Sequence, residues 1–169
     1  GLARQQRGEF AEAIDALERS RAMTRERGTA LEAEPFRLSF LGEAHSGLGE
    51  HERARELMQE GLQLARERGQ AGAEMIITAA LARVLLVSRG AAAADEVEAL
   101  LRSGLEVVER TQAQAFEPFM RAELAELARQ TGDEEGHQRE LAEAHRLFIE
   151  VGAPARAERL APQLATTSR

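Results

Sequence analysis

Apolar and small residues recur along this chain at separations of three, four and seven positions, which place them on one face of an α-helix. Ala54, Met58 and Gly61 form one such series, and similar series follow at other points of the chain. The pattern predicts amphipathic helices that come in pairs, each with a leading and a second helix. We expect second helices over residues 9–27, 51–68, 93–110 and 135–151, and leading helices over residues 35–48, 73–89 and 118–131.

Glycines separate the two members of each predicted pair at nearly constant intervals. Gly8, Gly49, Gly90 and Gly132 follow one another at 41, 41 and 42 residues. Because glycine readily takes the left-handed conformation that closes a helix, each should end one helix and turn the chain into the next. The chain would open at Gly1 inside an incomplete leading helix. The predicted repeats cover about residues 1–28, 29–69, 70–111 and 112–152.

The tripeptide Glu-Pro-Phe occurs twice, 83 residues apart, and marks the same position in two repeats. Pro35 and Pro118 suit the first turn of a helix, where the missing N–H of proline costs nothing. Phe36 and Phe119 follow them, and Ile76 is the matching residue of the repeat between. The two copies therefore indicate a repeat.

A terminal helix is expected over residues 153–165, and Pro162 should end or kink it because proline removes a helix hydrogen bond. Residues 166–169 would form a polar tail, and the array would make one domain over residues 1–165. Repeats bury a continuous core only by stacking, so the first repeat would leave a face uncovered. We therefore expect either that the chain is part of a longer protein or that another copy covers this end.

The centres of two pairs resemble the tetratricopeptide repeat. The resemblance implies an all-α fold, a right-handed α-solenoid of antiparallel helix pairs. The period of 41–42 residues exceeds the 34 of that family and looks like that of kinesin light chains and bacterial signalling regulators. A histidine replaces the usual alanine at one tight helix crossing, so close packing is not expected there. The matching residues are Leu41-Gly42, Gly49, Ala54 and Met58, then Leu124-Ala125, Gly132, His137, Leu141 and Ala144.

The segment "EAHRLFIEVGAPARAERLAPQL" is similar to the end of the repeat arm in large bacterial regulators, namely LuxR-type and maltose-regulator-type ATPases and class III nucleotidyl cyclases. The similarity implies a regulatory or sensor arm of a larger bacterial signalling or transcription-regulating protein. A stand-alone adaptor that associates with itself is the alternative. The similarity is carried by Leu147-Phe148, Gly152-Ala153 and Ala157-Glu158-Arg159.

Charge and composition limit the classes of molecule that we expect as binding partners. The net charge is −7, and acidic and basic residues alternate, which disfavours direct nucleic-acid binding and anionic membranes. We see no apolar run near the roughly 20 residues that span a bilayer. The absence of cysteine fits a reducing, cytoplasmic setting. A protein or peptide, or another domain of a parent chain, is the expected partner, and self-association is possible.

Catalytic and metal-binding motifs are missing from the sequence. It has no phosphate-binding glycine loop, no serine elbow and no His-Glu-x-x-His. His45 and His51 are six residues apart, whereas two ligands on one helix would be three or four apart; His137 and His145 are two turns apart, too far for one metal. We therefore expect no enzyme, no cofactor and no metal.

A binding stripe is implied by the resemblance, because leading helices line the concave groove in tetratricopeptide folds. The residues lie at helical spacings of three and four, which share one face. In the alternative interpretation, Phe36 and Phe119 fill the gap to the preceding helix. Clustered Lys and Arg are lacking, which disfavours acidic peptide tails. The stripe comprises Phe36, Ser39, Glu43 and Ser46, then Ile76, Ala79 and Arg83, then Phe119, Ala122, Glu126 and Arg129.

Overall fold

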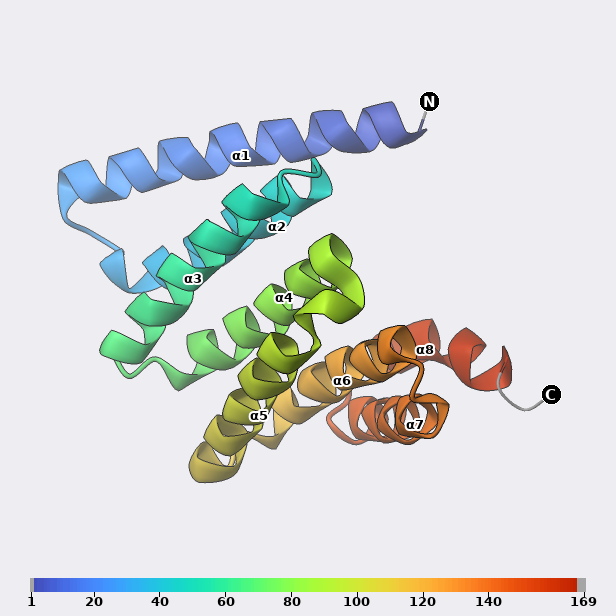
Figure 1. Cartoon of the computed structure of the whole chain (residues 1–169). Coiled ribbons are helices and arrows are strands. Elements are labelled where there is room, and N and C mark those ends of the chain that lie inside the picture. The colour runs from blue at the N-terminus through green and yellow to red at the C-terminus, as the bar shows by residue number, and fades with distance from the viewer. Residues whose placement is uncertain (1, 167–169) are drawn as a thin grey trace. The chain divides into compact units, whose positions relative to one another are not determined.

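A computed structural model describes the backbone of residues 2–166 and the side chains of residues 8–164. The chain forms two compact units, Gly1–Val84 and Leu85–Arg169. Figure 1 labels the helices along the chain. Among the described residues there are helices and no strands, which confirms the all-α class. The handedness of a solenoid and the single domain over residues 1–165 stay predictions.

The observed helices follow the predicted pairs within a few residues, except at the start of the chain. In the first unit the leading helix α2 (Glu34–Gly47) pairs with the second helix α3 (His51–Glu67), after α1 (Leu2–Arg27) and the short 3-10 helix η1 (Leu31–Ala33). The leading helix α4 (Ala71–Arg89) crosses from one unit into the other. The second unit continues with η2 (Gly90–Ala93), α5 (Ala94–Thr111), η3 (Gln114–Phe116), α6 (Glu117–Thr131), α7 (Glu134–Glu150) and α8 (Pro154–Thr166).

Left-handed residues end the helices, as the glycine spacing predicts. Gly49, Gly90 and Gly132 have φ values of 84°, 56° and 80°. A second series, which sequence analysis missed, follows the second helices at Gly28, Gly69, Gln112 and Gly152, all with positive φ. Both turns of the repeat are therefore marked in the backbone, and Gln112 takes the place of glycine in one of them.

The prediction for the first repeat was wrong. The helix α1 runs without a break through Gly8, which is not among the glycines with positive φ. A separate helix of seven residues would be too short to form by itself, because helix nucleation is costly. Continuing one helix through a glycine costs only about 1 kcal/mol. The chain therefore opens with a second helix and with no described leading helix before it.

Pro162 was predicted to end or kink the terminal helix, and it does not end it. It lies inside α8, which continues to Thr166. A proline in a helix loses one hydrogen bond and crowds the preceding turn, yet here it does not stop the helix. Pro35 and Pro118 lie at the first or second position of α2 and α6, which confirms their predicted place.

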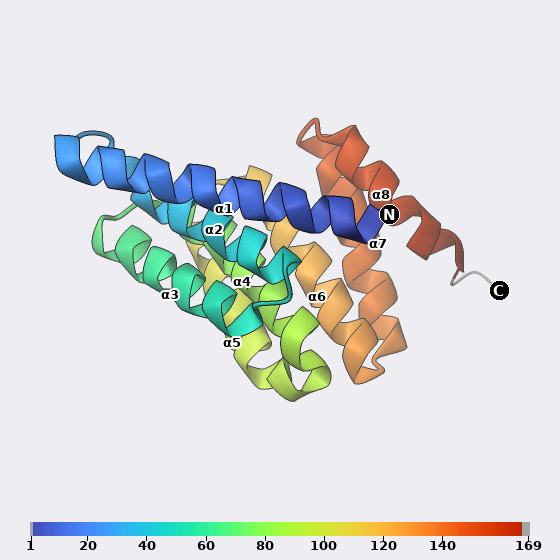
Figure 2. The ribbon, with the colours of Figure 1, turned by 90° about the horizontal axis from the view of Figure 1, so that it is seen from above.

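The core of the first unit lies where α1, α2 and α3 meet. Leu38, Leu41 and Leu57 are fully buried there, and Ile14 and Leu17 of α1 pack against them. A Cβ atom added at Gly47 of α2 would lie 2.5 Å from the ring of Phe10, so α1 approaches the end of α2 closely. Figures 1 and 2 show α1 running along α2.

One long apolar stretch, residues 71–111, is long enough and apolar enough by composition to cross a membrane, and it is the one such stretch in the described part of the chain. Its mean hydropathy is 1.7, but 67% of the apolar window is buried. Burial of this kind is what a core helix shows, so the stretch is weak evidence for a membrane span. The expectation of no membrane partner stays a prediction.

Candidate functional site

The exposed side of the leading helices in the first unit carries large apolar residues. Phe40 of α2 is 50% exposed and Ile76 of α4 is 39% exposed, while Phe36 is half-buried. Glu43 and Arg83 lie on the same two helices and are exposed. These five residues, Phe36, Phe40, Glu43, Ile76 and Arg83, are called the leading-helix surface below.

An ion pair joins the two helices that carry this surface. The Nη1 atom of Arg83 on α4 lies 3.8 Å from the Oε1 atom of Glu43 on α2. The two predicted stripe positions are therefore neighbours across the helices. Because both side chains are about half exposed, the pair adds little to stability and stays open to exchange with a partner's charges.

Three stripe residues of the first unit do not belong to an open surface. Ser39 is only 2% exposed and Ala79 is buried, so neither can contact a partner. Ser46 is half-buried beside the ring of His51, with 3.4 Å between its Oγ atom and Nδ1. The exposed stripe of α2 runs instead through Phe40, which sequence analysis missed because a spacing of three was chosen where four applies. An exposed phenylalanine one position after Ser39 was the available signal.

The stripe of the second unit is occupied by contacts within the chain. The Phe119 ring meets the Phe148 ring edge to face, with 5.1 Å between centroids. The guanidinium carbon of Arg156 on α8 lies over the Phe119 ring, 4.7 Å from its centroid. Phe119 thus packs against α7 and α8, which follow it in the chain, whereas the alternative interpretation placed it in the gap to the preceding helix. Ala122 is half-buried.

The remaining two stripe residues of the second unit pair with each other. The Nε and Nη2 atoms of Arg129 donate to the two carboxylate oxygens of Glu126, at 2.8 and 2.6 Å. The hydrogen bonds from Arg129, with another from Gln130, lower the pKa of the Glu126 carboxyl, and the bonds to Glu126 raise the pKa of Arg129. Position 126 corresponds to Glu43 in the first unit, 83 residues earlier, where the partner is on the next leading helix instead.

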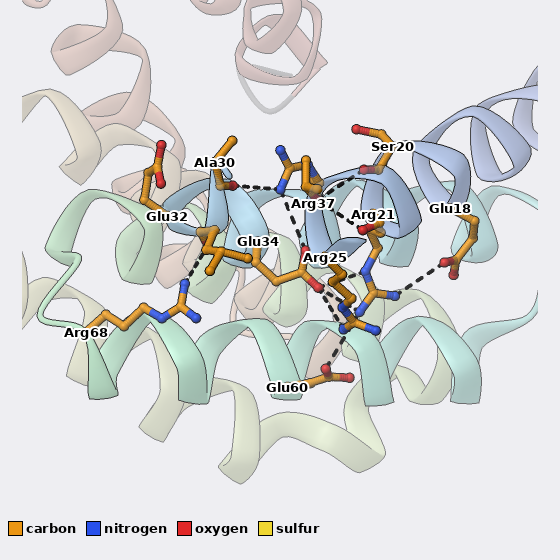
Figure 3. Close-up of polar contacts among 12 residues, drawn as sticks. Glu18, Ser20, Arg21, Arg25, Ala30, Glu32, Glu34, Arg37, Glu60 and Arg68 are labelled. Carbon is orange, nitrogen blue, oxygen red and sulfur yellow. Dashed lines mark hydrogen bonds and ion pairs between the residues drawn. The ribbon is translucent and has the colours of Figure 1, made fainter. Parts of the chain in front are cut away.

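The glutamate of the first Glu-Pro-Phe is the centre of a buried ion network (Figure 3). The Oε1 atom of Glu34 lies 2.9 Å from Arg21 and 3.0 Å from Arg25, both on α1, and Arg37 lies 3.7 Å from its other oxygen. Arg21 is itself buried and also faces Glu60 of α3 at 3.8 Å. The network ties α1 to the start of α2, so its role is structural.

Sequence analysis missed this network, although the repeat contains a signal for it. Arg25 and Arg66 are 41 residues apart, and each pairs with the glutamate at the start of the following leading helix. Arg66 lies 2.8 Å from Glu74. At the second Glu-Pro-Phe the equivalent of Arg66 is not arginine, and Glu117 pairs with Arg121 of its own helix at 2.9 Å.

Metal-binding geometry is not found in the part of the chain that the structure describes. No group of three or more His, Asp or Glu side chains is placed to hold a metal ion there. His45 contacts Glu50 at 2.5 Å across the turn between α2 and α3. A hollow of about 330 Å³ between α5, α6 and α7 is lined by Asp133, Arg139 and Glu140 among others. Asp133 caps α7 by accepting from the N–H of Gly136, and Glu140 pairs with Arg121.

Comparison with protein-family models and with curated proteins finds no match for this chain.

Proposed function

We propose that this chain is a protein-binding helical scaffold that holds a peptide or a protein segment on the leading-helix surface of its first unit. The exposure of Phe40 and Ile76, on the two helices that the Glu43–Arg83 pair joins, carries this proposal. Large apolar side chains on a helix surface usually mark a contact site when they lie together. Arginine and aromatic residues are the residues that most often anchor interfaces.

The chemistry of the surface favours a partner segment with apolar side chains and few charges. Phe36, Phe40 and Ile76 supply apolar contact area, while the single ion pair supplies one group of each sign. A run of acidic residues would meet only Arg83 and would be repelled by Glu43. The scaffold is therefore proposed to bind an apolar or amphipathic segment.

The proposed setting is the cytoplasm of a bacterium, where the chain would serve as the regulatory or sensor arm of a signalling or transcription-regulating protein. This part of the proposal is supported by the resemblance of residues 147–159 to the repeat arms of such regulators. A fold alone does not give function, so the binding surface and the cellular role are separate proposals.

A library of random peptides displayed on phage tests the binding surface. Peptides selected on the natural chain should lose most of their binding when Phe40→Ala and Ile76→Ala are combined, by tenfold or more in Kd. A double variant with Ile149→Ala and Val151→Ala is the matched control, because both residues are exposed and lie outside the leading-helix surface.

The control variant should keep the affinity of the natural chain, and both variants should keep its far-ultraviolet circular dichroism. Equal binding of the selected peptides to the natural chain and to the Phe40/Ile76 variant would contradict the proposed surface. Failure to select any peptide that binds would count against a peptide-binding function itself.

A further inference from the structure

The leading-helix surface has a regular layout on two consecutive leading helices. Glu43 of α2 and Arg83 of α4 are neighbours, with 3.8 Å between their charged atoms. Phe36 and Ile76 each lie seven residues earlier, which is about two helical turns. The helix α3 runs back between α2 and α4, so these two run in the same direction (Figure 1). The equal spacing therefore places Phe36 and Ile76 level with each other.

This layout divides the surface into an apolar end and a charged end. Phe40 is 50% and Ile76 39% exposed, and Phe36 is half-buried. At the other end the acid belongs to α2 and the base to α4, and both side chains are about half exposed. Each helix thus carries an apolar group and, about two turns later, one charge, and the two charges have opposite signs.

Such a surface is complementary to itself. When a second copy is turned by half a turn about an axis parallel to α2 and α4, α2 of each copy faces α4 of the other. The level along the helices is kept, so the two apolar ends meet. Glu43 of each copy then faces Arg83 of the other. A half-turn about an axis across the helices would instead lay each charged end on an apolar end, which leaves charges without partners.

We propose that a second copy of this chain covers the leading-helix surface, with α2 of each copy facing α4 of the other. Each carboxylate then has one guanidinium in its own copy and a second one in the other copy. The four charges alternate in sign, and such electrostatic complementarity fixes the register of a contact. The pair within the chain supplies the charges for this contact, so no charge on the surface meets its own sign.

The second unit contributes differently, because its equivalent positions are already in contact within the chain. Phe119 meets Phe148 and Arg156, and Glu126 pairs with Arg129 of its own helix. The proposed contact therefore uses one surface twice and closes at two copies. Stable interfaces usually have about 20–30 residues on each side, so a contact centred on the five residues of this surface should be weak and reversible.

The inference rests on the proposed function, because it names a second copy as an occupant of the same surface. A peptide partner and a second copy would compete for Phe40 and Ile76. The surface would be open at low concentration of the chain and covered at high concentration. Self-association would in this way regulate access of a partner segment.

Exchanges of charge test the proposed pairing. Glu43→Arg or Arg83→Glu alone brings like charges together across the contact and should weaken self-association by at least about tenfold. An equal mixture of the two variants restores opposite charges and should dimerise as readily as the natural chain. The weight-average mass, measured by light scattering with refractive-index detection, should rise from the 18.5 kDa of one copy toward twice that value as concentration increases.

The matched controls are Arg53→Glu and Glu56→Arg, each made alone. These two residues form an exposed ion pair at 3.1 Å on α3, outside the leading-helix surface. Each control should dimerise like the natural chain, and every variant should keep the far-ultraviolet circular dichroism of the natural chain. A natural chain that stays at 18.5 kDa at millimolar concentration would overturn the proposal. So would controls as weak as the surface variants, or a mixture no stronger than either variant alone.

Peptides selected by phage display separate this inference from the proposed function. A selected peptide in excess should dissociate the dimer of the natural chain. Peptides that require Phe40 and Ile76 for binding to a chain that stays monomeric would overturn the dimer and leave the proposed function standing. A dimer that is lost when Phe40→Ala and Ile76→Ala are combined, with no peptide selected, would support the dimer and contradict peptide binding.

Discussion

The helix pairs α2/α3 and α6/α7 are built on the same offsets, 83 residues apart, and differ where the two helices cross. Gly42 crosses Ala54 and Met58 in the first pair, and a Cβ atom added at Gly42 would lie 2.6 Å from the Cγ atom of Met58. In the second pair Ala125 crosses His137, which is 6% exposed and lies 2.8 Å from the carbonyl oxygen of Ala125. The first crossing is filled by apolar residues around a glycine, and the second by a polar side chain.

The difference shows that the shared spacing of the repeats determines where the two helices cross, but not which side chains occupy the crossing. A carbonyl oxygen can only accept a hydrogen bond, so the Nδ1 atom of His137 carries the proton and donates. A buried polar group is tolerated when it has a partner. The expectation that His137 prevents close packing was wrong for this reason, since Leu141 and Ala144 beside it are also buried.

The largest effect is expected when a histidine is placed at the helix crossing of the first pair. In Ala54→His, the imidazole would enter a fully buried site. The backbone of Ala54 already lies so close to Gly42 that a Cβ atom at position 42 would be 3.0 Å from the Ala54 carbonyl oxygen. Overpacking and an unpaired buried ring nitrogen should together lower the free energy of unfolding by about 3 kcal/mol. Urea unfolding followed by far-ultraviolet circular dichroism measures it, since the chain has no Trp or Tyr.

The control for this change is Gln59→His, at an exposed position of the same helix. It should alter the free energy of unfolding by less than about 0.5 kcal/mol. If Ala54→His proves as mild as Gln59→His, the two crossings are interchangeable and the comparison fails.

The start of each leading helix gives the next largest difference. Glu34 is buried and pairs with the buried Arg21, whereas Glu117 and its partner Arg121 are both partly exposed. Glu34→Gln leaves Arg21 without its nearest carboxylate and should cost about 2 kcal/mol. Glu117→Gln should cost about 0.5 kcal/mol, as expected for a partly exposed pair. Equal losses in the two variants, in the same urea titrations, would show that burial does not separate these pairs.

Removing the histidine from the crossing of the second pair should have a smaller effect on stability than inserting a histidine into the first crossing. His137→Ala loses one hydrogen bond and leaves a small gap, for a cost of about 1.5 kcal/mol. His145→Ala is the control, because His145 lies on the same helix and is only half-buried. Hydrogen exchange read by mass spectrometry should show faster exchange in α6 and α7 for the first variant alone. Unchanged protection of both helices would mean that His137 does not hold the crossing.

Sequence reasoning placed most helices because their boundaries depend on local signals. Apolar spacing located the pairs, and Gly49, Gly90 and Gly132 were found at the left-handed turns that their spacing indicates. The start of the chain was misjudged because Gly8 has the same spacing but lies inside a helix. Spacing alone does not say whether a glycine closes a helix, since this depends on whether a helix long enough to be stable precedes it.

The candidate site was less predictable because it depends on which side of each helix its neighbours cover. Positions 36, 43, 76 and 83 were placed on the surface, while Ser39 was chosen instead of Phe40. Phe119 has the same sequence context as Phe36 but is covered by Phe148 and Arg156, which are distant in sequence. Contacts of this kind depend on how the helices pack, and the local spacing of apolar residues does not predict them.

The smallest expected effect sharpens the comparison at positions 43 and 126, which are equivalent in the two pairs. The hydrogen bonds from Arg129 lower the pKa of Glu126, so the carboxylate is bound more tightly in the folded chain. Its contribution to stability is therefore complete above the ordinary glutamate pKa of about 4.3 and is lost as the pH falls through the lowered value. Because the pair is partly exposed, that contribution should be about 0.5 kcal/mol.

Glu126→Gln should consequently be less stable than the natural chain by about 0.5 kcal/mol at pH 7, and the difference should vanish near pH 2. Paired urea titrations across this pH range measure the difference. Glu106→Gln, at an exposed position in the same unit, should show no such pH-dependent difference. A Glu126→Gln variant that differs from the natural chain equally at pH 2 and pH 7 would mean that the amide changes packing. The Glu126–Arg129 pair would then add no charge-dependent stability to α6.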